Sequence, residues 1–139
     1  MDILKVKTIG PKLGYGTSDS AGLDLELAND IVIAPGATET INTGISVAIP
    51  KGYFGLVVPR SSTGRKNLVL TNTVGIIDAD YRGNLMCNIK NIGNTTFIGY
   101  RGDKLFQLVI LPYATMRPVY VDELETTERG SGGFGSTDK

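Results

Sequence analysis

The stretch GISVAIP, Gly44 to Pro50, alternates apolar residues with smaller or polar ones. Successive side chains of an extended chain point to opposite faces, so Ile45, Val47 and Ile49 would share one face. The same period recurs near the C-terminus in PVYVDEL, where Val119 and Val121 alternate. This period is typical of a β-strand with one buried face, and it predicts a strand in both segments.

Short apolar stretches between turn residues continue this pattern along the chain. Eighteen glycines and six prolines interrupt the sequence, and no helical period is longer than a turn or two, so we predict an all-β domain of many short strands. One short helix is expected after Pro59, in RSSTGRKN, where hydroxyl groups can cap exposed N–H groups. Further strands are expected at residues 3–8, 23–27, 31–33, 53–58, 68–71, 85–92, 96–98 and 104–111.

The length of 139 residues predicts one domain with one core. We expect this domain to occupy residues 1–128 and a glycine-rich C-terminal arm to occupy residues 129–139. The arm carries four glycines between Gly130 and Gly135. Such a backbone is too unconstrained to order itself without a partner, so we expect the arm to be mobile in the free protein.

The composition excludes several kinds of chemistry. The chain has no histidine, which rules out a Ser-His-Asp triad and any metal site with histidine ligands. Its single cysteine, Cys87, lies in the strand-like LMCNI and is expected to be a buried apolar side chain. Fourteen basic residues balance fourteen acidic ones, so we expect no nucleic acid or membrane partner, and the N-terminus has no targeting segment, which predicts a cytoplasmic protein.

Two polar positions in the first half of the chain suggest a ligand site. Asp24 in AGLDLELA alternates with leucines, so it is either a solvent-facing strand carboxylate or part of a site. In PRSSTGRKNL, Arg60 stands beside the hydroxyls of Ser61, Ser62 and Thr63. A guanidinium, hydroxyls and free N–H groups suit a phosphate, although an N-cap with a surface arginine would give the same pattern.

The stretch GIIDADYRGN, Gly75 to Asn84, places carboxylates directly after an apolar run. Asp78 and Asp80 would share a face, and the residues preceding Asp78 are apolar. Apolar surroundings disfavour a charged carboxylate and so strengthen it as a general base. The alternative is a polar hairpin tip without chemistry.

Two later segments also differ from a plain β domain. Gln107 is the only uncharged polar residue in KLFQLVI, and a buried amide must bond either to the backbone or to a ligand. In the arm, glycine N–H groups can hold an anion, Arg129 supplies charge, Ser136 and Thr137 supply donors, and Phe134 offers an aromatic face. A nucleoside triphosphate with Mg²⁺ satisfies all these features, with Asp24 reaching the metal through water.

Five segments in this order resemble the motifs of the trimeric deoxyuridine triphosphatases (dUTPases): AGLDL, PRSSTG, GIIDADYRGN, GDKLFQLV and RGSGGFGST. The resemblance implies a jelly-roll-like distorted β-barrel that forms a homotrimer, with shared active sites at the subunit interfaces. It also implies Mg²⁺-dependent hydrolysis of dUTP to dUMP and pyrophosphate, which keeps uracil out of DNA and supplies dUMP for thymidylate synthesis.

The resemblance assigns roles to individual residues. Asp78 would activate the attacking water, the hairpin with Asn72 would read uracil, Tyr81 would press against deoxyribose, and Phe134 would stack on the base. The full set of implied substrate contacts is Arg60, Ser61, Ser62, Gly64, Asn72, Gly75, Ile76, Ile77, Tyr81, Met86, Gln107, Arg129, Phe134, Gly135, Ser136 and Thr137.

Two other functions remain open on the sequence. A dCTP deaminase or a bifunctional relative resembles this chain in an RSS-like motif, but such enzymes are longer and use a glutamate near the base. A regulatory protein whose arm closes over the nucleotide could instead offer a changed surface to a protein partner.

Overall fold

A computed structural model of the chain describes residues 2–137 and confirms the predicted all-β class. Its helical content in that range is one 3₁₀ turn, η1 (Gly64–Lys66). The strands are β1 (Lys5–Thr8), β2 (Leu13–Tyr15), β3 (Gly22–Glu26), β4 (Ile31–Ile33), β5 (Thr38–Asn42), β6 (Ile45–Ala48), β7 (Tyr53–Pro59), β8 (Leu68–Leu70), β9 (Gly75–Ile77), β10 (Met86–Asn91), β11 (Phe97–Gly99) and β12 (Lys104–Pro112).

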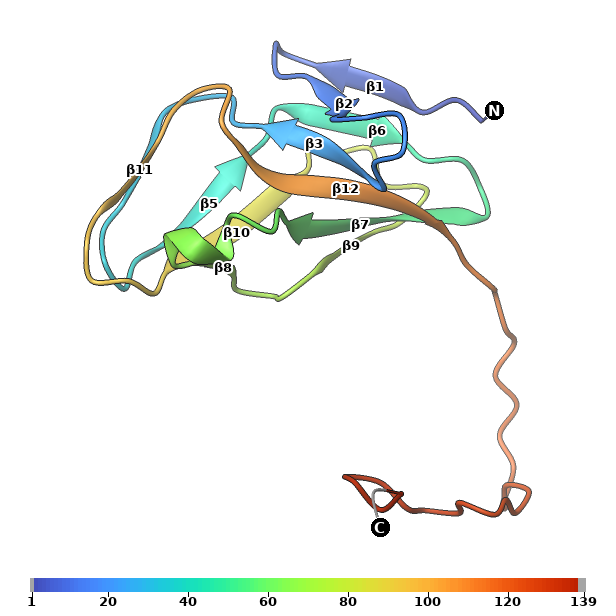
Figure 1. The fold of residues 1–139 in the computed structure, drawn as a ribbon. Coiled ribbons are helices and arrows are strands. Elements are labelled where there is room, and N and C mark those ends of the chain that lie inside the picture. Colours follow the sequence, from blue (N-terminus) through green and yellow to red (C-terminus); the bar gives the residue numbers. More distant parts are fainter. Residues whose placement is uncertain (1, 138–139) are drawn as a thin grey trace.

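The strands form four hydrogen-bonded sheets around one apolar core (Figure 1). The largest sheet has the order β2-β3-β12-β7-β9, and a second has the order β5-β10-β8. The other two are the pairs β1-β6 and β11-β4. The described strands therefore do not form one continuous ring of hydrogen bonds. In this one respect the observed all-β architecture differs from a closed form of the predicted jelly-roll-like barrel.

The core consists of alternate side chains from these strands. Ile45 and Val47 are buried on β6, as their period predicts, and β10 and β12 contribute Ile89 and Phe106. Cys87 is also buried, and burial raises the pKa of its thiol from 9.0 to about 12. A thiol with this pKa is not a nucleophile near neutral pH, so the prediction that Cys87 is a core residue is confirmed.

Three predictions about local structure need correction. β2 and β5 were not predicted, since their sequences, the three-residue LGY and the mostly polar TETIN, lack a clear apolar period. The expected helix after Pro59 is only the turn η1, and Thr63 makes no side-chain cap there. The predicted strand around Val119 and Val121 is not a strand in the single chain.

The chain leaves the sheets after β12. Residues 113–137 contain no strand and run away from the sheets as an extended segment (Figure 1). Apolar side chains on this segment are exposed, among them Tyr120 at 98% and Leu124 at 86%. The boundary between residues 128 and 129 stays a prediction, and the last two residues of the predicted arm, Asp138 and Lys139, lie outside the described part of the chain.

Candidate active site

Asp24, Arg60 and Gln107 form a cluster on three neighbouring strands, which we call the Arg60 cluster. Gln107 on β12 lies opposite Asp24 on β3 and opposite Val58 on β7. Arg60, directly after β7, places its Nε 3.1 Å from Asp24 Oδ1. The β-sheet register therefore brings together side chains that are 83 positions apart in the sequence.

The Asp24 side chain is only 12% exposed, so it does not point into solvent as a plain strand carboxylate would. Removing a carboxylate from water is costly unless a cation and hydrogen bonds replace the water. The Arg60 guanidinium, itself 39% exposed, supplies that charge. One edge of Arg60 is thus held by Asp24, and its exposed part remains available to an anion.

The amide of Gln107 is bonded to the backbone. Its Nε2 donates to the carbonyl oxygen of Pro59 at 3.2 Å. On the other side, a Cβ at Gly22 would collide with the Gln107 side chain, so only glycine leaves room for this amide between β3 and β12. Gly22 is a positioning residue that the sequence reasoning did not single out, although it stands inside AGLDL.

The loop after β7 is fixed to the start of β12. The carbonyl oxygen of Leu105 accepts a hydrogen bond from Arg60 N at 2.9 Å and another from Thr63 Oγ1 at 2.6 Å. The register of β12 against β3 shifts between Lys104 and Phe106, so Leu105 is the irregular residue whose carbonyl serves this loop. Thr63 is 1% exposed, whereas Ser61, Ser62 and Gly64 are exposed around it. Only the structure distinguishes the anchoring hydroxyl from its exposed neighbours.

A second group of predicted residues lies on the hairpin that contains β9. β9 pairs with β7, with Ile77 opposite Gly55 and Gly75 opposite Val57. Before β9, Thr73 adopts a positive φ of 68° and Val74 N donates to Asn72 O at 2.7 Å. The tight turn exposes Asn72 beside Gly75. After β9, Tyr81 N donates to Asp78 O at 3.1 Å, which closes the turn that presents Asp78.

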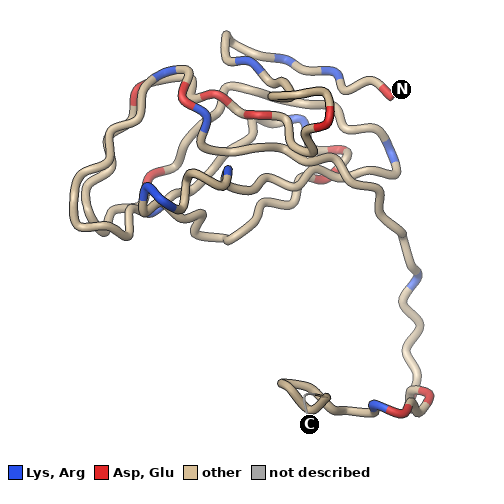
Figure 2. Tube along the Cα trace, in the orientation of Figure 1, with Lys and Arg blue, Asp and Glu red and all other residues tan. Residues whose placement is uncertain are grey.

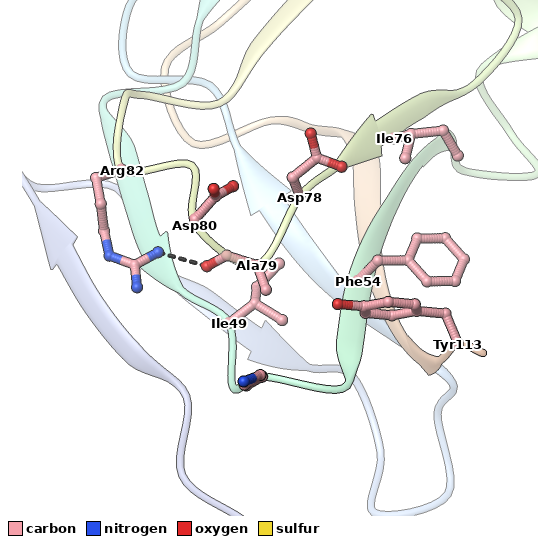
Figure 3. A pocket seen from close by; sticks show the side chains of 9 residues that line it. Ile49, Phe54, Ile76, Asp78, Ala79, Asp80, Arg82 and Tyr113 are labelled. Atoms are coloured by element: carbon pink, nitrogen blue, oxygen red, sulfur yellow. Dashed lines mark hydrogen bonds between the residues drawn. The ribbon is translucent and has the colours of Figure 1, made fainter. Parts of the chain in front are cut away.

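Asp78 borders an open pocket of about 820 Å³ (Figure 3). Asp78 and Asp80 line it together, as their spacing predicts, and Arg82 on the far side donates to the carbonyl oxygen of Ala79. The apolar part of the wall includes Phe54 and Tyr113, whose rings meet edge to face with centroids 6.4 Å apart. The remaining lining residues are Ile49, Lys51 and Ile76.

The expectation that apolar neighbours enclose Asp78 is not met in the single chain. Asp78 is exposed, and Ile76, which precedes it on the same face, is 58% exposed. Any desolvation of this carboxylate must therefore come from a bound molecule or from another subunit. The same hairpin exposes Tyr81 at 41% and Met86, at the start of β10, at 49%.

The arm residues form a third group. Arg129 Nε donates to Gly132 O at 2.7 Å, and Ser136 N donates to Gly133 O at 3.2 Å. Phe134 is fully exposed, and Gly135, Ser136 and Thr137 are exposed as well. The structure leaves this group apart from the sheets (Figure 1).

Arg60 and Asp78 lie towards opposite ends of β7: Arg60 directly follows β7, and Asp78 directly follows β9, which pairs with β7. Ile77, the neighbour of Asp78, lies opposite Gly55, which is five residues before Arg60 on β7. At about 3.3 Å per residue, roughly 17 Å separates the two positions. In the single chain, β7 therefore holds the Arg60 cluster and Asp78 apart.

Charged residues of both signs are distributed along the trace (Figure 2). Recognition of an anion must therefore depend on local groups such as the Arg60 cluster. Among residues 2–137, Asp, Glu and Cys side chains do not gather in threes that could hold a metal ion by themselves. Over the same range, the structure contains no helix that is long and apolar enough to cross a membrane.

Comparison with known proteins places the chain in a family. The sequence model of the dUTPase family matches residues 10–138. The chain belongs to the dUTPase family. The deoxyuridine 5'-triphosphate nucleotidohydrolase of Escherichia phage T5 is 48% identical over 97% of this chain and 98% of its own length. The corresponding dUTPase of the bacterium Tolumonas auensis is 41% identical over 99% of this chain and 98% of its own length.

Solved dUTPase structures agree with this assignment. The dUTPase of Staphylococcus bacteriophage 80alpha in complex with dUPNHPP has a TM-score of 0.91 and 31% identity, over 98% of both chains. It is described among phage dUTPases that control the transfer of virulence genes by a proto-oncogenic G protein-like mechanism. A variant dUTPase from phage phi11 of S. aureus, described as coordinating a structural Mg(II) ion, has a TM-score of 0.80 and 31% identity over 90% of this chain and 100% of that one. The predicted family and the predicted class of enzyme, a dUTP nucleotidohydrolase, are confirmed.

Proposed function

We propose that this protein hydrolyses dUTP to dUMP and pyrophosphate, with Asp78 orienting and activating the attacking water. The water oxygen bonds to the α-phosphorus, its proton passes to Asp78, and the bond from the α-phosphorus to the departing pyrophosphate breaks. The observation that carries the proposal is the place of Asp78 in a chain of the dUTPase family: it directly follows β9, is exposed, and borders the pocket of Figure 3. This reaction keeps uracil out of DNA and supplies dUMP for thymidylate synthesis.

The β9 hairpin is proposed to hold the nucleoside. The backbone of Gly75, Ile76 and Ile77, together with Asn72, reads the uracil edge. Tyr81 presses against the deoxyribose, with Met86 close by. The exposure of Asn72, Tyr81 and Met86 in the single chain supports this role, because a nucleoside can reach them.

The Arg60 cluster is proposed to hold the phosphates, together with the adjacent loop. Arg60 contributes a charge already oriented by Asp24, and Gln107 lies beside it on β12. Ser61, Ser62 and Gly64 offer exposed hydroxyls and backbone N–H groups on the loop that Leu105 O anchors. Pre-oriented donors of this kind lose little entropy when an anion binds.

The arm is proposed to close over the bound nucleotide. Arg129, Gly135, Ser136 and Thr137 would contact the triphosphate, and Phe134 would stack on uracil. Their exposure, and the distance of the arm from the sheets in Figure 1, fit a segment that acquires its partners when substrate binds.

A homotrimer with shared sites would bring the three groups of residues together. In one chain, the Arg60 cluster and Asp78 are about 17 Å apart along β7, and the arm is far from both. The exposed apolar side chains of residues 113–124 also require cover, and symmetric assembly supplies it. We therefore propose that each site takes the Arg60 cluster, the β9 hairpin and the arm from different subunits.

Mg²⁺ fits the residues present. It binds preferably through substrate phosphates, keeps several waters and needs few protein carboxylates. Asp24 is held by Arg60 on one oxygen, so it suits a contact through water better than direct ligation. When bound, the metal ion would withdraw charge from the phosphates during hydrolysis.

A regulatory role is the second candidate function. It is favoured by the structural likeness to the phage 80alpha dUTPase, whose description includes control of virulence-gene transfer, and by the exposed segment 113–137. Closure of the arm over dUTP would change the surface offered to a protein partner. A dCTP deaminase is less well supported, because the pocket contains Asp78 and Asp80 but no glutamate.

The proposal is tested by pyrophosphate release from dUTP, dCTP, dTTP and UTP, with Mg²⁺ and with a chelator. We expect release from dUTP, lost on chelation and reduced at least about 100-fold in Asp78→Asn, because the amide cannot accept the proton. Asp80→Asn is the matched control, since Asp80 lines the same pocket without an assigned catalytic role, and we expect it to retain most of the activity. Full turnover by Asp78→Asn would overturn the role of Asp78, and consumption of dCTP would favour the deaminase.

A further inference from the structure

The ring of Tyr81 is connected to strand β6 through Asn84. Tyr81 OH donates to the carbonyl oxygen of Asn84 at 2.7 Å. The side chain of the same Asn84 accepts, at Oδ1, a hydrogen bond of 2.7 Å from Ser46 Oγ on β6. The next residue adds a backbone bond, from Leu85 N to Ile45 O at 2.8 Å. Asn84, whose carbonyl oxygen accepts the hydrogen bond from the phenol group, is therefore fixed to β6 through its side chain and through the adjoining backbone.

Gly83 fixes the ring from a second direction. A Cβ at Gly83 would lie 2.5 Å from the hydroxyl oxygen of Tyr81 and 2.7 Å from the carbon that bears it. The tip of the ring thus packs directly over the Gly83 backbone, and any larger residue would displace it. Since Tyr81 is 41% exposed, packing against the core does not hold the ring, and these local contacts determine its position.

We propose that Ser46, Asn84 and Gly83 are positioning residues that set the ring of Tyr81 and thereby the preference for deoxyribose over ribose. The inference rests on the proposed contact between Tyr81 and the sugar. A ring excludes a single hydroxyl only if it cannot retreat, so the selectivity depends on the supports of the ring as much as on the ring itself. Loss of a support lets the ring move away and admits the 2′-hydroxyl.

The test compares kcat/KM for UTP with kcat/KM for dUTP in Ser46→Ala and Gly83→Ala. We expect the UTP to dUTP ratio to rise about threefold to tenfold in Ser46→Ala, as for loss of one hydrogen bond, and further in Gly83→Ala. Ser46→Thr keeps the hydroxyl and should restore the ratio of the unaltered protein. Thr40→Val is the matched control: Thr40 Oγ1 also bonds to an asparagine Oδ1, that of Asn88 at 2.6 Å, but this pair has no contact with Tyr81.

A double-mutant cycle separates positioning from a general loss of structure. If Ser46 acts through Tyr81, then Ser46→Ala should change the ratio little when Tyr81→Phe has already removed the phenol hydroxyl. An unchanged ratio in Ser46→Ala, or fully additive effects, would overturn the inference and leave dUTP hydrolysis standing. If the unaltered protein does not hydrolyse dUTP, the proposed function itself fails. Should Gly83→Ala not fold, judged by its melting temperature, Ser46→Ala decides alone.

Discussion

Two variants with little activity of their own should regain activity when their subunits are mixed. The variants are Arg60→Gln, which retains an N–H donor for Asp24, and Asp78→Asn. One removes the charge of the Arg60 cluster and the other removes the base at the far end of β7. The proposed site takes these two residues from different subunits, because β7 holds them about 17 Å apart within one chain.

The expected recovery follows from counting subunits. Suppose that trimers assemble at random from equal amounts of the two variants. The Asp78→Asn chain still carries Arg60, and the Arg60→Gln chain still carries Asp78. A site is intact when its Arg60 comes from the first kind of chain and its Asp78 comes from the second. Each condition is met in half of the cases, so about one quarter of the sites should be intact. If one chain supplied both residues, every site would lack one of them.

The assay is pyrophosphate release from dUTP after the two variants are unfolded and refolded together. The unaltered protein and each variant alone, treated in the same way, set the upper and lower limits. The matched control pairs Arg60→Gln with Gln107→Ala, because these residues belong to one cluster in one chain and should not complement each other. The shared site would be refuted if mixtures shown to contain both chains were no more active than the separate variants. If the control pair recovered activity, the residues of the Arg60 cluster would not come from a single chain.

Two further predictions concern residues outside the direct contacts. Gly22→Ala should raise the KM for dUTP with little effect on folding, because a Cβ at residue 22 forces the Gln107 side chain away from its place beside Pro59. Steady-state kinetics measure the KM and a melting curve measures the stability of the fold. An unchanged KM would contradict the prediction. The free energy of unfolding should fall as the pH rises from 9.0 towards about 12, because the pKa of Cys87 is higher in the folded state than in the unfolded state and only the unfolded chain then releases the proton. Denaturant unfolding at several pH values measures this fall, and Cys87→Ala should reduce it.

Much of the sheet structure could be predicted because burial on one face leaves a period in the sequence. Ile45 and Val47 show this period and are buried on β6. The strand predicted at Val119 and Val121 shows the same period but lies free in the single chain. A strand needs a neighbouring backbone to bond with, and a sequence pattern does not say whether that neighbour is in the same chain.

The candidate site was predictable by residue type but not by arrangement. Arg60 and Asp24 could be selected as unusual charged residues, yet their ion pair depends on the register that both β3 and β7 adopt with β12. The support given by Gly22 and Thr63 could not be inferred, because a small residue and a hydroxyl are common in turns and strands for many reasons. Side-chain burial distinguishes Thr63 from the exposed Ser61 and Ser62, and the Thr63 hydroxyl bonds to Leu105 O, where the register of β12 against β3 shifts.

The order of the five motifs along the sequence differs from their grouping in space, and the topology explains why. β3 and β7 both pair with β12, so the first, second and fourth motifs meet at one end of the large sheet. β9 pairs antiparallel with the middle of β7, from Gly55 to Val57, so the chain leaves β9 at Asp78 towards the end of β7 that lies away from Arg60. A strand of seven residues cannot bend to bring its two ends together without losing its hydrogen bonds to both neighbours. Flexibility of β7 therefore does not bring Arg60 and Asp78 together, and this is why the proposed site takes them from different subunits.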